Sequence, residues 1–205
     1  MGIEMLRGAL DKSLINSLVT QYWRVSVVDV TASTQTNLAD LARRGKAKPG
    51  DVIAANYQSA GRGRLSRTFE APKNSALLFS FYIQPKRKQD EWGWISLIAG
   101  VSVAEVLSEV KASVKWPNDI FVDEKKIAGI LIENSLGQHH VDRSIIGIGL
   151  NVNQEGFSTP NATSLKLESA RDWDLNRVLE YLIYRFDHYL EILSEQNEEI
   201  IRDFD

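Results

Sequence analysis

The sequence predicts an α+β fold: a mixed, largely antiparallel sheet flanked by helices, which we place on one side of the sheet. Runs of β-rich segments are interrupted by single helical segments in the order β-α-β-β-α-β-β-β-β-α, instead of alternating strictly with them. The 205 residues suffice for one large domain, because domains usually contain about 100–200 residues. Neither a repeat nor a linker divides the chain, so we expect a single domain over residues 1–205.

The first half of the chain predicts two helices and two strands in alternation. An amphipathic stretch over Leu10–Leu18 indicates a short helix, and the alternating segment Trp23–Val30 indicates a strand. A hydroxyl cap at Ser33, apolar residues at helical spacing and a stop at Gly45 predict the next helix. The apolar run Asp51–Tyr57 predicts a buried strand that leads into a loop.

The second half predicts short strands between two longer helices. Apolar residues recur every three or four positions over Ile95–Val110 and again over Leu175–Leu193, which indicates helices. A turn at Asp123-Glu124 indicates a hairpin between two of the β segments. The β segments of this half are Ser75–Ile83, Val114–Trp116, Ile120–Val122, Lys126–Ile132 and Ser144–Val152.

Composition excludes several classes of function. Lysine plus arginine number 24 and aspartate plus glutamate 27, so the net charge is −3, and we expect no nucleic-acid partner, since non-specific binding needs an excess of cations. The short basic run Lys86-Arg87-Lys88 is typical of a solvated turn. The absence of cysteine excludes disulfides and thiolate nucleophiles and fits a reducing compartment.

No segment indicates secretion or a membrane span. The start of the chain lacks a long apolar region, and the most apolar stretch, Ile95–Val106, contains Glu105 and is too short to cross about 30 Å of hydrocarbon. We therefore expect a cytoplasmic protein without a membrane partner. His139-His140 and His188 have no third ligand at metal spacing, so we assign no metal-binding residue.

The loop Gly61-Arg62-Gly63-Arg64, with Arg67 three residues on, is the first motif that carries chemistry. Glycines let backbone N–H groups approach an anion closely, and arginines offer paired donors to phosphate or carboxylate. Such a loop could equally belong to an RNA-contacting arginine–glycine segment. Strand-like sequence on both sides, Tyr57-Gln58 and Phe69, favours a loop that clamps a small anionic ligand.

Three further segments present polar groups or an open backbone. In Lys115-Trp116-Pro117-Asn118-Asp119 the proline fixes a turn. Two interpretations are open: the turn displays a cation, an amide and a carboxylate to a ligand, or it is only a hydrogen-bonded turn with its tryptophan in the core. Glycines within the β segments Lys126–Glu133 and Gly147–Asn153 indicate close approach of a backbone or a flat ligand. Ser33-Thr34-Gln35 is a helix cap whose hydroxyls could also hold a carbonyl or carboxylate.

Taken together and in order, these segments resemble the catalytic domain of biotin protein ligases, from about Val27 to Glu168. The resemblance implies the mixed sheet of that family, which is related to class II aminoacyl-tRNA synthetases and lipoate ligases. It rests on Ser33-Thr34-Gln35, Gln58-x-x-Gly61-Arg62-Gly63-Arg64, Lys115-Trp116-Pro117-Asn118-Asp119, Lys126-x-x-Gly129-Ile130-Leu131-x-Glu133 and Gly147-x-Gly149-x-Asn151.

The resemblance also implies a reaction in two steps. The carboxylate of biotin attacks the α-phosphate of ATP to give biotinyl-5′-AMP and pyrophosphate, with Mg²⁺ sharing the neutralisation of charge. A lysine of a carboxylase's biotin carrier domain then attacks the mixed anhydride and releases AMP. Biotin, ATP and the carrier domain are thus the implied partners, and a homodimer is compatible with the family.

Residue roles follow from the resemblance, position by position. Lys126, Asp119 and Arg62 are implied as catalytic. Residues implied in contacts with biotin are Ser33, Thr34, Gln35, Gln58, Gly61, Arg62, Gly63, Arg64, Lys126, Gly129, Leu131 and Gly147. Residues implied near the nucleotide are Arg64, Arg67, Phe69, Lys115, Asn118 and Asn151.

Two departures from the family pattern limit these expectations. The residues before Val25 are too few for the winged helix of repressor–ligases, so we expect no transcriptional repression. The chain ends at Asp205, where many members continue into a small SH3-like barrel, so we expect that barrel to be absent. A lipoate–protein ligase and a biotin sensor without catalysis remain the alternatives to a biotin ligase.

Overall fold

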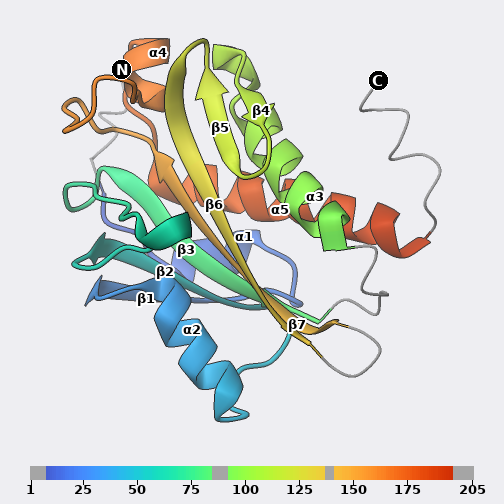
Figure 1. The fold of residues 1–205 in the computed structure, drawn as a ribbon. Coiled ribbons are helices and arrows are strands. Elements are labelled where there is room, and N and C mark those ends of the chain that lie inside the picture. Colours follow the sequence, from blue (N-terminus) through green and yellow to red (C-terminus); the bar gives the residue numbers. More distant parts are fainter. Residues whose placement is uncertain (1–7, 85–91, 137–140, 196–205) are drawn as a thin grey trace.

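A computed structural model describes residues 8–84, 92–136 and 141–195 and contains a seven-stranded sheet (Figure 1). The strands are β1 Arg24–Thr31, β2 Asp51–Gln58, β3 Ala76–Ile83, β4 Ser113–Lys115, β5 Asp119–Val122, β6 Lys125–Leu136 and β7 Val141–Asn151. The α-helices are α1 Lys12–Leu18, α2 Thr34–Arg43, α3 Trp92–Val106, α4 Leu165–Ser169 and α5 Leu175–Glu195. Short 3₁₀ turns cover Arg64–Ser66 and Ser108–Val110.

The strand order is β1-β2-β3-β7-β6-β5-β4. Only β1 and β2 pair in parallel among the described strands, joined by the crossover that contains α2, and each other neighbouring pair is antiparallel. The predicted mixed, largely antiparallel sheet is therefore confirmed. The predicted hairpin between β5 and β6 is also present, and Asp123 at its turn has a φ of 51°, which aspartate tolerates better than most residues.

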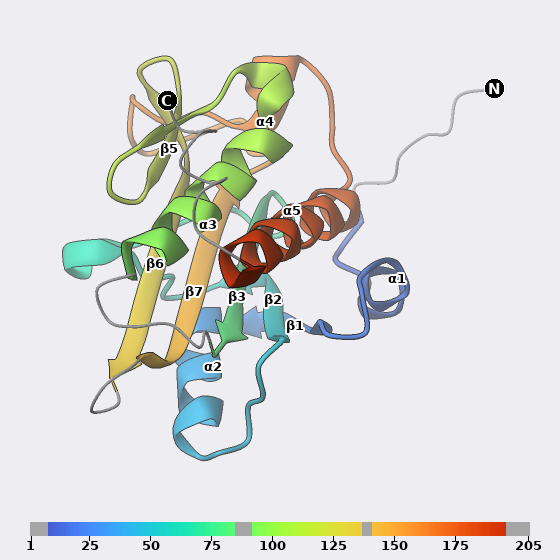
Figure 2. The ribbon, with the colours of Figure 1, turned by 90° about the vertical axis from the view of Figure 1, so that its right-hand side faces the viewer.

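Helices cover both faces of the sheet, so the expectation that they lie on one side is wrong. Phe79 and Phe81 of β3 belong to the main core with α3 and α5, and Figure 2 shows these two helices together over one face. Tyr82 points to the opposite face and clusters with Leu38 of α2. Successive strand residues face opposite sides, and every residue of β3 is buried, which requires cover on both faces.

The helix predicted over Leu175–Leu193 is α5, whereas α4 was not predicted. Five residues are too few to show an apolar period, and the signal for α4 lies in its cap: the hydroxyl of Ser164 accepts from the backbone N–H of Leu167 at 3.2 Å. In the described part of the chain, no helix combines the length and apolar character needed to cross a membrane. The run Lys86-Arg87-Lys88 lies outside the described residues.

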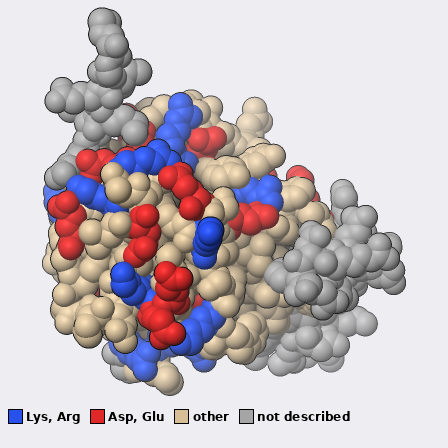
Figure 3. Space-filling model, turned by 90° about the horizontal axis from the view of Figure 1, so that it is seen from above, with Lys and Arg blue, Asp and Glu red and all other residues tan. Residues whose placement is uncertain are grey.

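Figure 3 shows the charged side chains on the face seen from above. Lysine and arginine are interspersed with aspartate and glutamate there. The mixture agrees with a net charge of only −3 for the whole chain. The lysine and arginine side chains most relevant to function line a pocket on the face of the sheet that α2 covers.

Candidate functional site

A pocket of about 410 Å³ lies on the face of the sheet that carries α2. Its walls come from the N-terminus of α2, the end of β2, the loop 61–69 and the turn before β5. Apart from Gly61, Lys115 and Asn151, the structure brings all of the predicted site residues together around it. These are Ser33, Thr34, Gln35, Gln58, Arg62, Gly63, Arg64, Arg67, Phe69, Asn118, Asp119, Lys126, Gly129, Leu131 and Gly147.

The floor of the pocket consists of β3, β7 and β6, whose register aligns small residues in rows. Ser80 pairs with Gly147, and Gly147 pairs with Leu131. In the next row on the same face, Gly149 pairs with Gly129. These glycines leave the floor flat enough for a ligand to lie against the backbone.

Two of these glycines leave room for a neighbouring side chain. A Cβ at Gly147 would stand 2.6 Å from Oε1 of Gln35, and a Cβ at Gly149 would stand 2.8 Å from the ring of Phe69. Both separations are well below van der Waals contact, so any larger residue would displace a wall of the pocket.

One end of the pocket presents hydroxyl and amide groups, and the charge of Arg62 at this end is neutralised by its ion pair with Glu133. Ser33 caps α2, and the backbone N–H of Thr34 donates to Oε1 of Gln58 at 2.7 Å. The hydroxyls of Thr34 and Ser80 lie 2.9 Å apart. Ser33, Thr34 and Ser80 are all buried, so their hydroxyls act in a site shielded from water.

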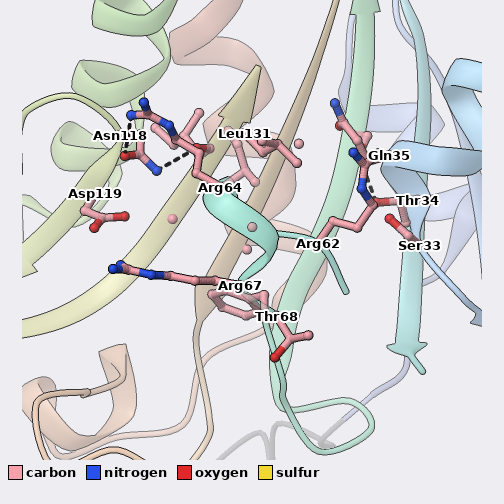
Figure 4. Close-up of a pocket in the computed structure, with 18 of the residues that line it drawn as sticks. Ser33, Thr34, Gln35, Arg62, Arg64, Arg67, Thr68, Asn118, Asp119 and Leu131 are labelled. Carbon is pink, nitrogen blue, oxygen red and sulfur yellow. Dashed lines mark hydrogen bonds between the residues drawn. The ribbon is translucent and has the colours of Figure 1, made fainter. Parts of the chain in front are cut away.

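The other end of the pocket is cationic. Nζ of Lys126 lies 2.6 Å from Oδ1 of Asp119, and Arg64 donates to Oδ1 of Asn118 at 3.1 Å. Arg67 also lines this end. Figure 4 shows the separation: Ser33, Thr34, Gln35 and Arg62 lie at one end, and Arg64, Arg67, Asn118 and Asp119 lie at the other.

The loop 61–69 folds back on itself over the pocket. The backbone N–H of Gly63 donates to the carbonyl of Arg67 at 2.8 Å, and that of Phe69 donates to the carbonyl of Gly61 at 3.1 Å. Leu65 at its tip has a φ of 53° and is 86% exposed. The predicted loop is therefore a small ordered hairpin whose arginines reach the pocket from above.

The remaining predicted residues lie beside the pocket. The ammonium of Lys115 lies 4.6 Å from the ring centroid of Phe121. The amide of Asn151 donates to the carbonyl of Thr163 at 3.0 Å, so it braces the segment after β7. A Cβ at Gly61 would come within 2.3 Å of the carbonyl oxygen of Phe69, which gives this glycine a role in folding the loop.

Sequence reasoning assigned no role to Thr68 or Ser80, which also line the pocket. Ser80 had a usable signal, because it is the single polar residue in the apolar strand Ala76–Ile83. Within the described residues, which leave out His139-His140, no group of three or more histidine, aspartate or glutamate side chains could hold a metal ion.

Comparisons with known proteins agree with the fold. Residues 27–151 match the biotin/lipoate A/B protein ligase family. A biotin–[acetyl-CoA-carboxylase] ligase of Mycobacterium tuberculosis is 32% identical over 98% of this chain and 78% of its own length. The bifunctional ligase/repressor BirA of Bacillus spizizenii is 34% identical over 78% of this chain. This chain spans about half, 51%, of that protein's length.

A solved structure gives the same assignment. The biotin protein ligase of Aquifex aeolicus, in complex with biotin and ATP, superposes with a TM-score of 0.73 and 33% identity. The alignment covers 84% of this chain and 72% of the other. The fold class predicted from the sequence and the family it resembles are both confirmed. The chain belongs to the biotin/lipoate A/B protein ligase family.

Proposed function

We propose that this chain catalyses the ATP-dependent ligation of biotin to a lysine of a biotin carrier domain, through biotinyl-5′-AMP. One observation carries the proposal: a single pocket joins a neutral hydrogen-bonding end to a cationic end. Biotin has the matching polarity, with a ureido ring at one end and a carboxylate at the other. The hydroxyl of Thr34 and the amide of Gln58 suit the ring, and the cations suit the carboxylate and the phosphate.

In the first step an oxygen of the biotin carboxylate attacks the α-phosphorus of ATP, and the bond to the pyrophosphate oxygen breaks. Two anions must approach, so their repulsion and the charge on the phosphoryl oxygens must be neutralised. Lys126 and Arg64 line the end of the pocket at which the carboxylate and the phosphate would meet. Phe69 offers an aromatic wall for the adenine.

In the second step the amine of a carrier lysine attacks the acyl carbon of biotinyl-AMP, and AMP leaves. The amine must lose a proton to become the amide nitrogen. Asp119 is the one carboxylate among the described residues that line the pocket, and we assign it the role of helping this deprotonation. The ion pair with Lys126 orients it.

The residues of this site suit a Mg²⁺ ion that binds together with the nucleotide. Magnesium in nucleotide sites usually takes one or two protein carboxylates together with phosphate oxygens and water. The pocket offers Asp119 and the amide oxygen of Asn118, and the described residues form no cage of three carboxylates. When bound, Mg²⁺ would neutralise phosphate charge.

Lipoate is the second candidate substrate, because the matching family includes lipoate ligases. Isothermal titration of the protein with biotin and with lipoate separates the two, and binding of lipoate but not biotin would overturn the proposal. The decisive assay is mass spectrometry of a carrier domain incubated with biotin, MgATP and the protein. A mass gain of one biotinyl group supports ligation. Biotin binding without pyrophosphate release indicates a sensor.

The proposed setting is the cytoplasm, where carboxylase carrier domains would be available. A chain without cysteine is compatible with that reducing compartment.

A further inference from the structure

Glu133 of β6 connects two residues that line the pocket, although it does not line that pocket itself. Its carboxylate accepts from Nε2 of Gln35 at 3.1 Å. It also accepts from the two Nη atoms of Arg62, at 2.6 and 3.2 Å. One carboxylate therefore holds both a side chain at the neutral end of the pocket and the loop above it.

Glu133 also fixes which way the amide of Gln35 points. Nε2 of Gln35 has two partners, the carboxylate of Glu133 and the carbonyl of Ile145 at 3.0 Å. Both partners can only accept, so the nitrogen must face them and the oxygen must face away. The assignment of oxygen and nitrogen in this amide follows from chemistry.

The oxygen turned away, Oε1 of Gln35, has no hydrogen-bond partner in the protein. Gln35 is only 3% exposed, and this oxygen lies at the wall shared with Gly147, where a Cβ would come within 2.6 Å of it. A buried acceptor without a partner is costly, and such groups are rare unless a ligand or water completes them. The unpaired acceptor therefore points to an N–H donor on the ligand.

We propose that Glu133 is a positioning residue: it aims Oε1 of Gln35 at a ligand N–H and anchors Arg62 over the same ligand. This inference rests on the proposed function and explains how the site would select biotin over lipoate. The ureido ring of biotin carries two N–H groups, whereas the dithiolane ring of lipoate carries none. A pocket with a fixed, unpaired acceptor rejects the ring without a donor, because the acceptor then stays unsatisfied.

Arg62 makes the second half of the arrangement. Its pair with Glu133 has the two-donor geometry that gives arginine–carboxylate contacts their directionality. Arg62 and Glu133 are 45% and 36% exposed, so the pair contributes little to folding. Its consequence is positional: the loop and the amide of Gln35 are tied to one carboxylate.

The test measures discrimination instead of affinity alone. Dissociation constants for biotin and for its two mono-N-methylated derivatives are determined by calorimetry in the wild type, Glu133→Ala and Glu133→Gln. In the wild type, biotin should bind at least about tenfold more tightly than the derivative methylated at the nitrogen facing Gln35. In Glu133→Ala this ratio should fall below the wild-type value, because only the carbonyl of Ile145 then holds the amide of Gln35 in place. Clashes of the methyl group with other residues cancel in the comparison.

Glu133→Gln keeps an oxygen for the amide of Gln35 and loses the charge that Arg62 pairs with. It should retain the wild-type ratio, which separates orientation of the amide from electrostatics. The matched control is Glu109→Ala, since Glu109 accepts from two nitrogens of Arg171 at a surface site away from the pocket. That variant should leave the ratio unchanged.

Gln35→Leu removes Oε1 without altering Glu133 and should lose the same discrimination, which keeps the test valid should Glu133→Ala fold poorly. An unchanged ratio in Glu133→Ala, or in Gln35→Leu, would overturn the inference. A wild-type protein that binds no biotin would instead overturn the proposed function.

Discussion

Lys126 and Asp119 form an ion pair across two neighbouring strands, with 2.6 Å between Nζ and Oδ1. Asp119 opens β5 and pairs in register with Gly129 of β6, the strand on which Lys126 lies. A Cβ at Gly129 would come within 3.2 Å of Nζ of Lys126, so the glycine gives the lysine its path along the floor. The pair places a cation and a carboxylate at the proposed reaction centre before any substrate binds.

Lys126→Ala should slow adenylate formation by about 100- to 1,000-fold, the usual cost of removing one preorganised electrostatic stabiliser. Stability should change much less, because Lys126 is 35% exposed. Pyrophosphate release in a single turnover measures the rate, and thermal unfolding measures stability. Lys125→Ala is the control, since Lys125 is 55% exposed and pairs with Glu168 outside the pocket. A wild-type adenylation rate in Lys126→Ala would refute the role given to this lysine.

Arg64→Ala should allow biotinyl-AMP to escape. Arg64 is the one loop residue that donates to Asn118 among the described contacts, and this bond ties the loop to the segment before β5. Without it, the anhydride would meet water and foreign amines more often. Biotin labelling of an unrelated lysine-rich protein should increase in Arg64→Ala and stay at the wild-type level in Arg171→Ala. Equal labelling in both variants would argue against a lid.

Gly149→Ala should weaken nucleotide binding. The added methyl group would stand 2.8 Å from the ring of Phe69, which must then move with the loop that carries it. Overpacking of this kind costs about 1–3 kcal/mol, which corresponds to a loss of affinity of about 5- to 160-fold if the strain is relieved when the site is empty. Calorimetry with a non-hydrolysable ATP analogue tests this. Gly93→Ala is the matched control, because a Cβ there meets nothing within 4 Å.

The sequence was sufficient to predict the residues of the pocket wherever a motif is local. Ser33 caps α2 as its hydroxyl predicted, and the segment 115–119 forms a turn around Pro117. Each of these features depends on a few consecutive residues, whose conformations are set by local hydrogen bonds and by the proline ring.

Other features depend on contacts that local patterns do not encode. Glu133 is separated from Arg62 by 71 positions and from Gln35 by 98, so the packing of α2 and of the loop 61–69 against β6 brings the three together. The side on which α2 packs was likewise predicted wrongly. Its apolar residues fit either face, and the preference for right-handed connections between parallel strands could be applied only once β1 and β2 were known to pair.

The pH dependence of folding stability tests a buried carboxyl group away from the pocket, that of Asp187. Burial raises the pKa of Asp187 on α5, and the nearby Glu191 adds to the effect, while the polar side chains of Trp23 and Thr20 oppose it. A carboxyl whose pKa is higher in the folded state loses its proton first in the unfolded chain. Ionisation of Asp187 therefore lowers stability as the pH rises through its unfolded pKa, near 3.9, to its folded value.

Asp187→Asn removes this charge and keeps the size and shape of the side chain. The variant should be more stable than the wild type at pH 7, and the difference should shrink as the pH falls below the unfolded pKa. Urea unfolding at several pH values measures both curves. Asp174→Asn is the comparison variant, because it also removes one negative charge, at the residue that precedes α5. A gain for Asp187→Asn that is the same at pH 3 and pH 7 would show that the buried charge is not its cause.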